Sequence, residues 1–73
     1  MARMLVVDDD KMVRSVLVEF LQDRGHQVDE AGNGSQAVAL VQNERFDVVF
    51  LDIIMPVMNG IETLRRLRLA MER

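Results

Sequence analysis

The stretch that decides the fold is Asp47–Gly60, which reads DVVFLDIIMPVMNG. Its apolar run, Val48–Leu51, has the length of a strand and stops at a carboxylate, Asp52. An uninterrupted apolar run of this length is typical of a parallel strand that is buried on both faces. Pro56 and the Asn-Gly pair at 59–60 end the strand and predict a shaped loop before the next helix. The sequence therefore predicts an acid at the rim of a sheet, where the chain turns.

The rest of the chain alternates short apolar runs with helical patterns. Strands are predicted at 4–8, 27–31 and 47–52, and helices at 10–24, 34–43 and 59–71. Gly25 suits the left-handed position just after the first helix. Apolar residues at helical spacing predict the inward side chains, which are Val13, Val16, Leu17, Phe20 and Leu21 in the first helix, Ala37, Leu40 and Val41 in the second, and Ile61, Leu64, Leu67 and Met71 in the third.

The order βαβαβα predicts an α/β fold, in which a parallel sheet has helices on both faces. Strand 4–8 is more apolar than strand 27–31, so we expect it at the centre, in the strand order 2-1-3. Right-handed crossovers then place the first helix on one face and the other two on the opposite face. Ligands bind at the carboxyl ends of the strands that flank such a reversal, so Asp8, Asp9 and Asp52 are predicted to converge.

Three carboxylates at one rim repel each other, and a divalent cation removes that cost. Oxygen ligands without histidine or cysteine favour Mg²⁺ or Mn²⁺ over zinc. A carboxylate can also act as a nucleophile and form an aspartyl phosphate, and Asp52 is the candidate because it stands alone on its strand. The alternative is that the acidic triplet at 8–10 only caps the following helix and compensates its dipole. We assign the capping role to Asp10.

Composition limits the possible partners. The 73 residues make one small domain at most, which buries only about 60% of its unfolded surface. A net charge of −3 gives no general attraction to nucleic acid or anionic lipid, and no apolar run approaches the ~20 residues of a membrane span. The chain has no cysteine. We therefore expect a cytoplasmic protein without direct nucleic-acid or membrane contacts. His26 follows Gly25, which ends a helix, and is predicted to be a solvated turn residue.

Two motifs resemble a known family. Residues 6–10, VVDDD, and residues 51–60, LDIIMPVMNG, look like the receiver domain of two-component response regulators. The second motif is highly specific, and the first is correctly spaced from it. The resemblance covers the whole chain, which corresponds to the first three of the family's five βα units. It implies the flavodoxin-like (CheY-like) fold and a partial receiver domain over residues 1–73.

The resemblance also implies a role for each matching position. Asp52 resembles the phosphoacceptor, Asp9 a direct Mg²⁺ ligand, and Asp8 its partner, which usually acts through water. The backbone carbonyl of Ile54 resembles the third protein ligand. The phosphodonor would be a histidine kinase, a phosphotransfer protein or a small acyl phosphate. The implied activity is that of a signalling module, with self-phosphorylation and self-dephosphorylation as its only chemistry.

Some features of the family have no counterpart among the 73 residues. These are a Ser or Thr after the fourth strand, and a Lys and a switch aromatic on the fifth; the single lysine, Lys11, lies at the start of the first helix. We expect strand 47–52 to have a free outer edge, which is a template for another strand. Self-association or a complementing chain at that edge is therefore predicted.

Two other functions stay open from the sequence. A haloacid-dehalogenase-type phosphatase would use Asp8 as nucleophile, and Asp8-x-Asp10 matches its acids, although Met12 stands where that family has Thr or Val. This reading leaves the loop around Pro56 unexplained. The third possibility is an interaction fragment that binds a kinase or another subunit without being phosphorylated.

Overall fold

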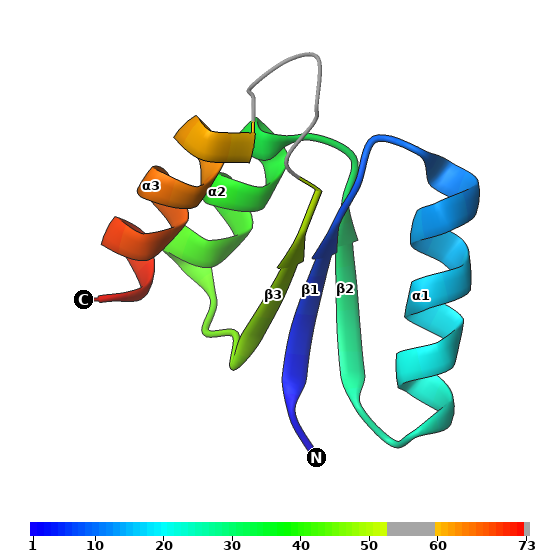
Figure 1. The fold of residues 1–73 in the computed structure, drawn as a ribbon. Helices are drawn as coiled ribbons and strands as arrows, with labels where there is room; N and C mark the ends of the chain where they lie inside the picture. Colours follow the sequence, from blue (N-terminus) through cyan, green and yellow to red (C-terminus); the bar gives the residue numbers. More distant parts are fainter. Residues whose placement is uncertain (53–59, 73) are drawn as a thin grey trace.

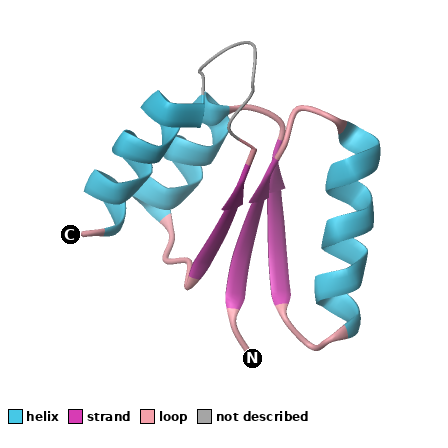
Figure 2. Cartoon of the chain, viewed as in Figure 1, coloured by secondary structure: helices cyan, strands magenta, loops and turns pink. Residues whose placement is uncertain are grey.

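The fold is a three-stranded parallel sheet between two layers of helices (Figures 1 and 2). The computed structural model describes residues 1–52 and 60–72. The strand order is β2-β1-β3, and α1 lies on one face of the sheet while α2 and α3 lie on the other. The predicted α/β fold and strand order are confirmed. The elements are β1 (Arg3–Val7), α1 (Lys11–Asp23), β2 (Gln27–Ala31), α2 (Gly34–Asn43), β3 (Val48–Leu51) and α3 (Gly60–Met71).

Several predicted boundaries move by one residue. The first helix begins at Lys11 instead of Asp10, because Asp10 has an extended backbone (φ −87°, ψ 109°) and caps the helix. Its carboxylate accepts hydrogen bonds from the N–H groups of Met12 (2.9 Å) and Val13 (3.3 Å), which confirms the predicted capping role. The same helix ends at Asp23, and Gly25 follows with the expected positive φ of 86°.

The central strand supplies side chains to both halves of the core. Alternate residues of a strand point to opposite faces. Leu5 and Val7 pack with α2, α3 and Phe46 on one side, and Met4 and Val6 pack with α1 on the other. All four are buried. This double burial explains why the first apolar run was a reliable marker of the central strand.

The orientation predicted for α1 is partly wrong. Leu17 and Leu21 do pack against the sheet, together with Val18. Val13, Val16 and Phe20, which were predicted to point inward, are exposed. The reason is that α1 packs on β1 and β2, so the part of its wide apolar face that extends toward β3 has nothing beneath it.

The inward face of α3 also differs from the prediction. Leu67 is buried as expected, but Ile61, Leu64 and Met71 are exposed. Small residues take their place, since Gly60 and Thr63 are buried. The helix lies side by side with α2 (Figure 1), and small side chains allow this close approach, whereas a helix packed on the sheet alone would bury its largest residues.

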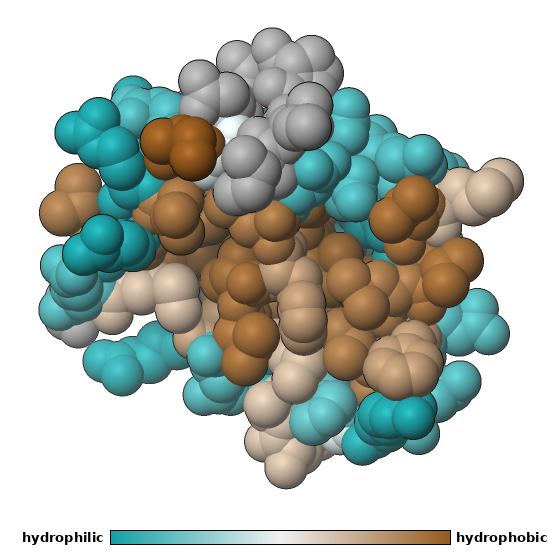
Figure 3. Space-filling model, viewed as in Figure 1, coloured by the Kyte–Doolittle hydropathy of each residue, from teal (hydrophilic) through white to brown (hydrophobic). Residues whose placement is uncertain are grey.

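Strand β3 is not buried on both faces as predicted. Val49 and Leu51 pack toward α2 and α3, but Val48 and Phe50 are each 37% exposed on the opposite face. Figure 3 shows apolar side chains gathered over this part of the molecule, between α1 and the α2–α3 pair. Among residues 1–52 and 60–72, no strand pairs with the outer edge of β3. The described helices therefore leave part of the apolar surface of β3 uncovered.

A charged cluster at the amino ends of the strands was not foreseen from the sequence. Arg3 donates hydrogen bonds from Nη2 to Asp29 (2.8 Å) and Glu44 (2.7 Å), and its guanidinium lies 4.8 Å from the centre of the Phe46 ring. The bond to Glu44, followed by that to Asp29, raises the pKa of Arg3. Its backbone also exchanges hydrogen bonds with Asp47. Arg3 therefore connects β1 to β2 and to the segment that leads into β3.

We expect Leu5→Ala to lower the free energy of unfolding by about 2–5 kcal/mol, because Leu5 on β1 is fully buried against α2. Urea denaturation followed by circular dichroism measures this loss. The matched control is Leu69→Ala on α3, where the leucine is 70% exposed and the change should stay within about 0.5 kcal/mol. Equal losses from the two variants would contradict the assignment of the core.

Candidate functional site

Two of the predicted site residues are placed by the hydrogen-bond ladder of the sheet. Asp8 follows β1, and its N–H donates to the carbonyl of Ala31 at the end of β2 (3.2 Å). Asp52 follows β3, and its N–H donates to the carbonyl of Val7 (2.9 Å). Because all three strands are parallel, these bonds bring both aspartates to the same edge of the sheet.

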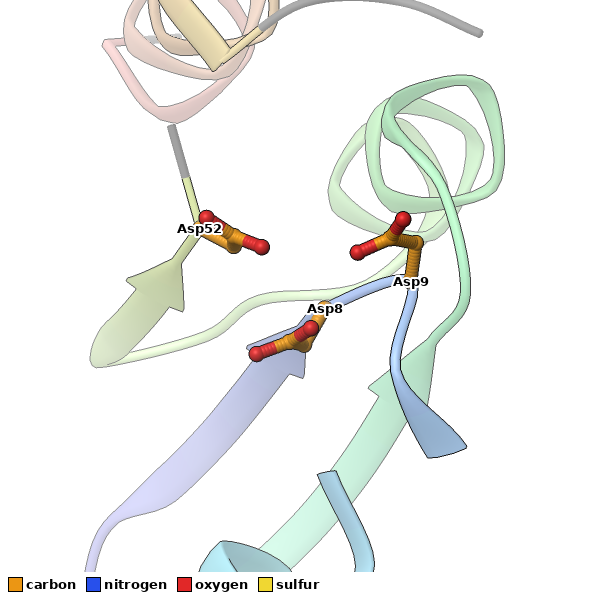
Figure 4. Close-up of side chains that lie close together, drawn as sticks. All are labelled: Asp8, Asp9 and Asp52. Carbon is orange, nitrogen blue, oxygen red and sulfur yellow. The ribbon is translucent and has the colours of Figure 1, made fainter. Parts of the chain in front are cut away.

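Asp9 completes a group of three carboxylates at this edge. Asp8, Asp9 and Asp52 each offer an oxygen, and these oxygens all lie within 4.8 Å of one another. Figure 4 shows the three side chains bordering one space, with Asp52 coming from the end of β3 and the other two from the turn after β1. Asp9 is exposed, while Asp8 and Asp52 are partly buried. The predicted convergence of these three residues is found.

The other acid of the triplet stays out of the group, because Asp10 caps α1 as described above. Ile54, Met55 and Pro56 lie outside the described residues. His26 is partly buried rather than a simple solvated turn residue, since its Nδ1 accepts a hydrogen bond from the N–H of Ala2 (3.1 Å). It directly precedes β2 and contacts the residue before β1, so it lies at the opposite end of the parallel sheet from the acids.

The donor chemistry of the acidic group fits a hard divalent cation. All the ligand atoms are carboxylate oxygens, which Mg²⁺ and Mn²⁺ prefer. Carboxylates whose oxygens lie within 4.8 Å of one another repel each other, and a cation offsets this repulsion. Asp9, the exposed member of the group, is accessible to solvent, and Mg²⁺ commonly keeps waters and phosphate oxygens among its ligands.

The family model of the response regulator receiver domain matches residues 4–72. The chain belongs to this family. Protein PilH of Pseudomonas aeruginosa is 46% identical over 67 residues, which cover 92% of this chain and 55% of PilH. Chemotaxis protein CheY4 of Vibrio cholerae superposes with a TM-score of 0.93 at 39% identity, covering 99% of this chain and 62% of that chain.

The response regulator TrrA of Thermotoga maritima is another structural relative. Its complex with Mg²⁺-BeF has a TM-score of 0.91 and 39% identity, and covers 99% of this chain and 63% of that chain. Its complex with the histidine kinase ThkA has a TM-score of 0.87 and 41% identity, and covers 93% and 59% of the two chains. The chain therefore spans roughly three fifths of the length of PilH, CheY4 and TrrA.

The acidic group of this receiver chain borders an apolar hollow. The hollow has a volume of about 340 Å³ and lies between α1 and the ends of β1 and β3. Asp8 and Asp52 stand at its rim, while Leu17 and Phe50 form part of its walls. The hollow could not be predicted from the sequence, because it depends on α1 packing over β1 and β2 and not over β3.

One residue near the site was missed from the sequence. Arg14, on the first turns of α1, donates a hydrogen bond from Nη1 to the backbone carbonyl of Asp8 (2.7 Å). It also donates from Nε to Glu30 on β2 (2.7 Å). The only available signal was the position of an arginine one turn after the acidic triplet, which by itself is also typical of a solvated helix face.

We expect Asp9→Asn to weaken Mg²⁺ binding by about tenfold or more, because it removes one charged ligand from a set of three. Titration calorimetry of the metal-free chain measures the effect. Asp10→Asn is the matched control, since asparagine also caps helices and Asp10 is outside the acidic group. Equal weakening by both variants would show that the group is not the metal site.

Proposed function

We propose that this receiver chain accepts a phosphoryl group on Asp52 from a histidine kinase, with Mg²⁺ or Mn²⁺ as cofactor. The observation that carries the proposal is the convergence of Asp8, Asp9 and Asp52 within 4.8 Å at the carboxyl edge of a parallel sheet. Membership of the receiver family supports the roles that we propose for the carboxylates. Asp8 and Asp9 would hold the cation together with Asp52 and the backbone carbonyl of Ile54.

The proposed transfer needs one nucleophile and one leaving group. A carboxylate oxygen of Asp52 attacks the phosphorus of the donor's phosphohistidine, a P–O bond forms, and the P–N bond breaks. The electron pair of that bond remains on the imidazole nitrogen of the donor. A bound divalent cation supplies neutralisation of the negative charge on the transferring group. Asp52 suits the nucleophile because it is the acid that comes from a different strand than the Asp8–Asp9 pair.

Partners and location belong to the same proposal. The complex of the relative TrrA with the histidine kinase ThkA supports a kinase as the phosphodonor. A phosphotransfer protein or a small acyl phosphate would serve the same chemistry. We propose a cytoplasmic location, in keeping with the lack of cysteine, and no direct contact with nucleic acid. Among the described helices, none is long and apolar enough to cross a membrane.

The domain assignment is also a proposal. Residues 1–73 would form the first three βα units of a receiver domain, in line with the share of each relative that the chain spans. The proposed role is that of a signalling module rather than a turnover enzyme. The phosphatase alternative has less support, because its second acid, Asp10, is engaged in capping α1 instead of facing Asp8 across a site.

We expect incubation with acetyl phosphate and Mg²⁺ to add one phosphoryl mass to the chain. The adduct should be labile to hydroxylamine, as an acyl phosphate is, and should be absent in Asp52→Asn. Intact-mass spectrometry measures both. Asp10→Asn, which keeps the cap of α1, should be labelled like the unmodified chain.

Other results would favour the competing functions. Label on Asp8, or hydrolysis of p-nitrophenyl phosphate that is lost in Asp8→Asn, would favour the phosphatase. A folded sample that binds Mg²⁺ but takes no label would favour an interaction fragment.

We also propose that the chain associates through the outer edge of β3. The two edges of the sheet differ in composition, because β2 carries Asp29 and Glu30 whereas β3, Val48–Leu51, carries no charge. Charged residues discourage edge pairing, so β3 is the edge that invites another strand. The exposed Phe50 and Val48 would be covered in the same event. In a pure sample the added strand comes from a second copy; a complementing chain would compete for the same edge.

We expect light scattering to show species larger than the 8.4 kDa monomer, with a concentration-dependent mean mass. Phe50→Lys should shift the sample toward the monomer, because it places a charge on the β3 edge. Gln27→Lys, on the exposed start of β2, is the control and should not. A monodisperse monomer with a cooperative melt and no binding of a hydrophobic dye would refute the association.

A further inference from the structure

Arg14 has an unusual set of contacts for a residue on the surface helix α1. Its side chain is only 15% exposed, although most polar residues of this helix face solvent. Nη1 reaches the backbone carbonyl of Asp8 and Nε reaches a carboxylate oxygen of Glu30, both at 2.7 Å. One guanidinium therefore connects α1, the turn after β1 and the end of β2.

The contact is made to the backbone of Asp8, which is a member of the acidic group. The backbone N–H of Asp8 is held by Ala31 on β2 (3.2 Å), and its carboxylate Oδ1 accepts from the N–H of Asp10 (2.9 Å). Arg14 holds the remaining polar group, the carbonyl oxygen. The bond from Arg14 is the one that a side chain donates, so it can be removed without changing the aspartates.

The geometry suits arginine and not lysine. A guanidinium has donors that point in fixed, separate directions, whereas an ammonium group is a single point of charge on a flexible stem. A lysine at this position can reach the Asp8 carbonyl or the Glu30 carboxylate, but it cannot hold both in the arrangement seen here. The conservative change Arg14→Lys therefore separates the charge of the residue from its bridging role.

We propose that Arg14 is a positioning residue, which fixes the turn at Asp8 and Asp9 so that their carboxylates are held ready for a divalent cation. This inference rests on the proposed function, because it names a residue that prepares the same metal site. Arg14 does not itself belong to the acidic group. It acts through the backbone of Asp8, while its charge is paired with Glu30.

Charge and positioning predict opposite effects, which makes the inference testable. A guanidinium near the site repels a cation, so if charge alone mattered, removing Arg14 would tighten Mg²⁺ binding. If positioning matters, loosening the turn weakens binding even when the charge is kept. Residues that orient metal ligands typically contribute about 10–100-fold to metal affinity.

The experiment compares Arg14→Lys and Arg14→Met with Arg24→Lys as the matched control. Arg24 lies at the far end of α1, where its guanidinium stacks on Phe20 at 3.8 Å. We expect Mg²⁺ affinity, measured by titration calorimetry, to fall about tenfold in both Arg14 variants and to stay unchanged in Arg24→Lys. Glu30→Gln, which leaves the Asp8 contact in place, should have a smaller effect than Arg14→Lys.

A second measurement needs no metal. Amide hydrogen exchange of the metal-free chain should show a faster rate at Asp10, whose N–H binds the Asp8 carboxylate, and an unchanged rate at core amides of β1. Unchanged exchange at Asp10 together with unchanged or tighter Mg²⁺ binding in Arg14→Lys would overturn the inference. If the unmodified chain binds no Mg²⁺, the proposed function fails, and the exchange rate at Asp10 still decides whether Arg14 holds the turn.

Discussion

Parallel pairing of β1 with a strand on each side is the constraint on which the rest of this structure depends. Each strand must enter from the same end, so each connection has to cross back along a face of the sheet through a helix. The same geometry fixes the site, since the N–H of Asp52 reaches Val7 and the N–H of Asp8 reaches Ala31 at one edge. Residues separated by more than forty positions become neighbours through backbone bonds alone.

The sequence was sufficient for this level of organisation. The apolar run Val48–Leu51 and the acids that follow it identify a strand and its carboxyl end, and the greater apolarity of the first strand identifies the centre of the sheet. These features are local, because strand length, turn residues and capping by Asp10 depend on neighbours in the chain. The convergence of three carboxylates then followed from the rules of strand connection.

The rotation of each helix about its own axis could not be predicted from the sequence, for a physical reason. The first helix has apolar residues over so wide an arc that several rotations bury a similar area, and the choice of Val18 over Val16 depends on the position of α1 above β1 and β2. In α3 the decisive contact is with another helix, which favours Gly60 and Thr63 over larger side chains. Periodicity identifies a helix, but the surface opposite it decides which residues are inside.

Arg3 and Arg14, whose side chains are mostly buried, illustrate a second limit of prediction from sequence. Arg3 joins elements at the amino ends of the strands, and Arg14 joins them at the carboxyl ends. Neither position is marked by a motif, because the acidic partners come from other elements and the Asp8 carbonyl is a backbone group that no residue type identifies. A long cationic side chain can reach many such partners, so only the folded arrangement selects among them.

The apolar hollow beside the acids connects the remaining features. Its walls include Leu17 and Phe50, and its rim carries Asp8 and Asp52. The exposed face of β3 continues from the same region, through Phe50 to Val48. A strand or helix that covered this face would also remove water from one side of the acidic group. Electrostatic interactions strengthen when water is excluded, so covering the hollow would increase both the repulsion among the carboxylates and their attraction for a cation. The proposed association at β3 and the proposed cation binding at the rim would therefore be coupled through the solvent beside the acidic group.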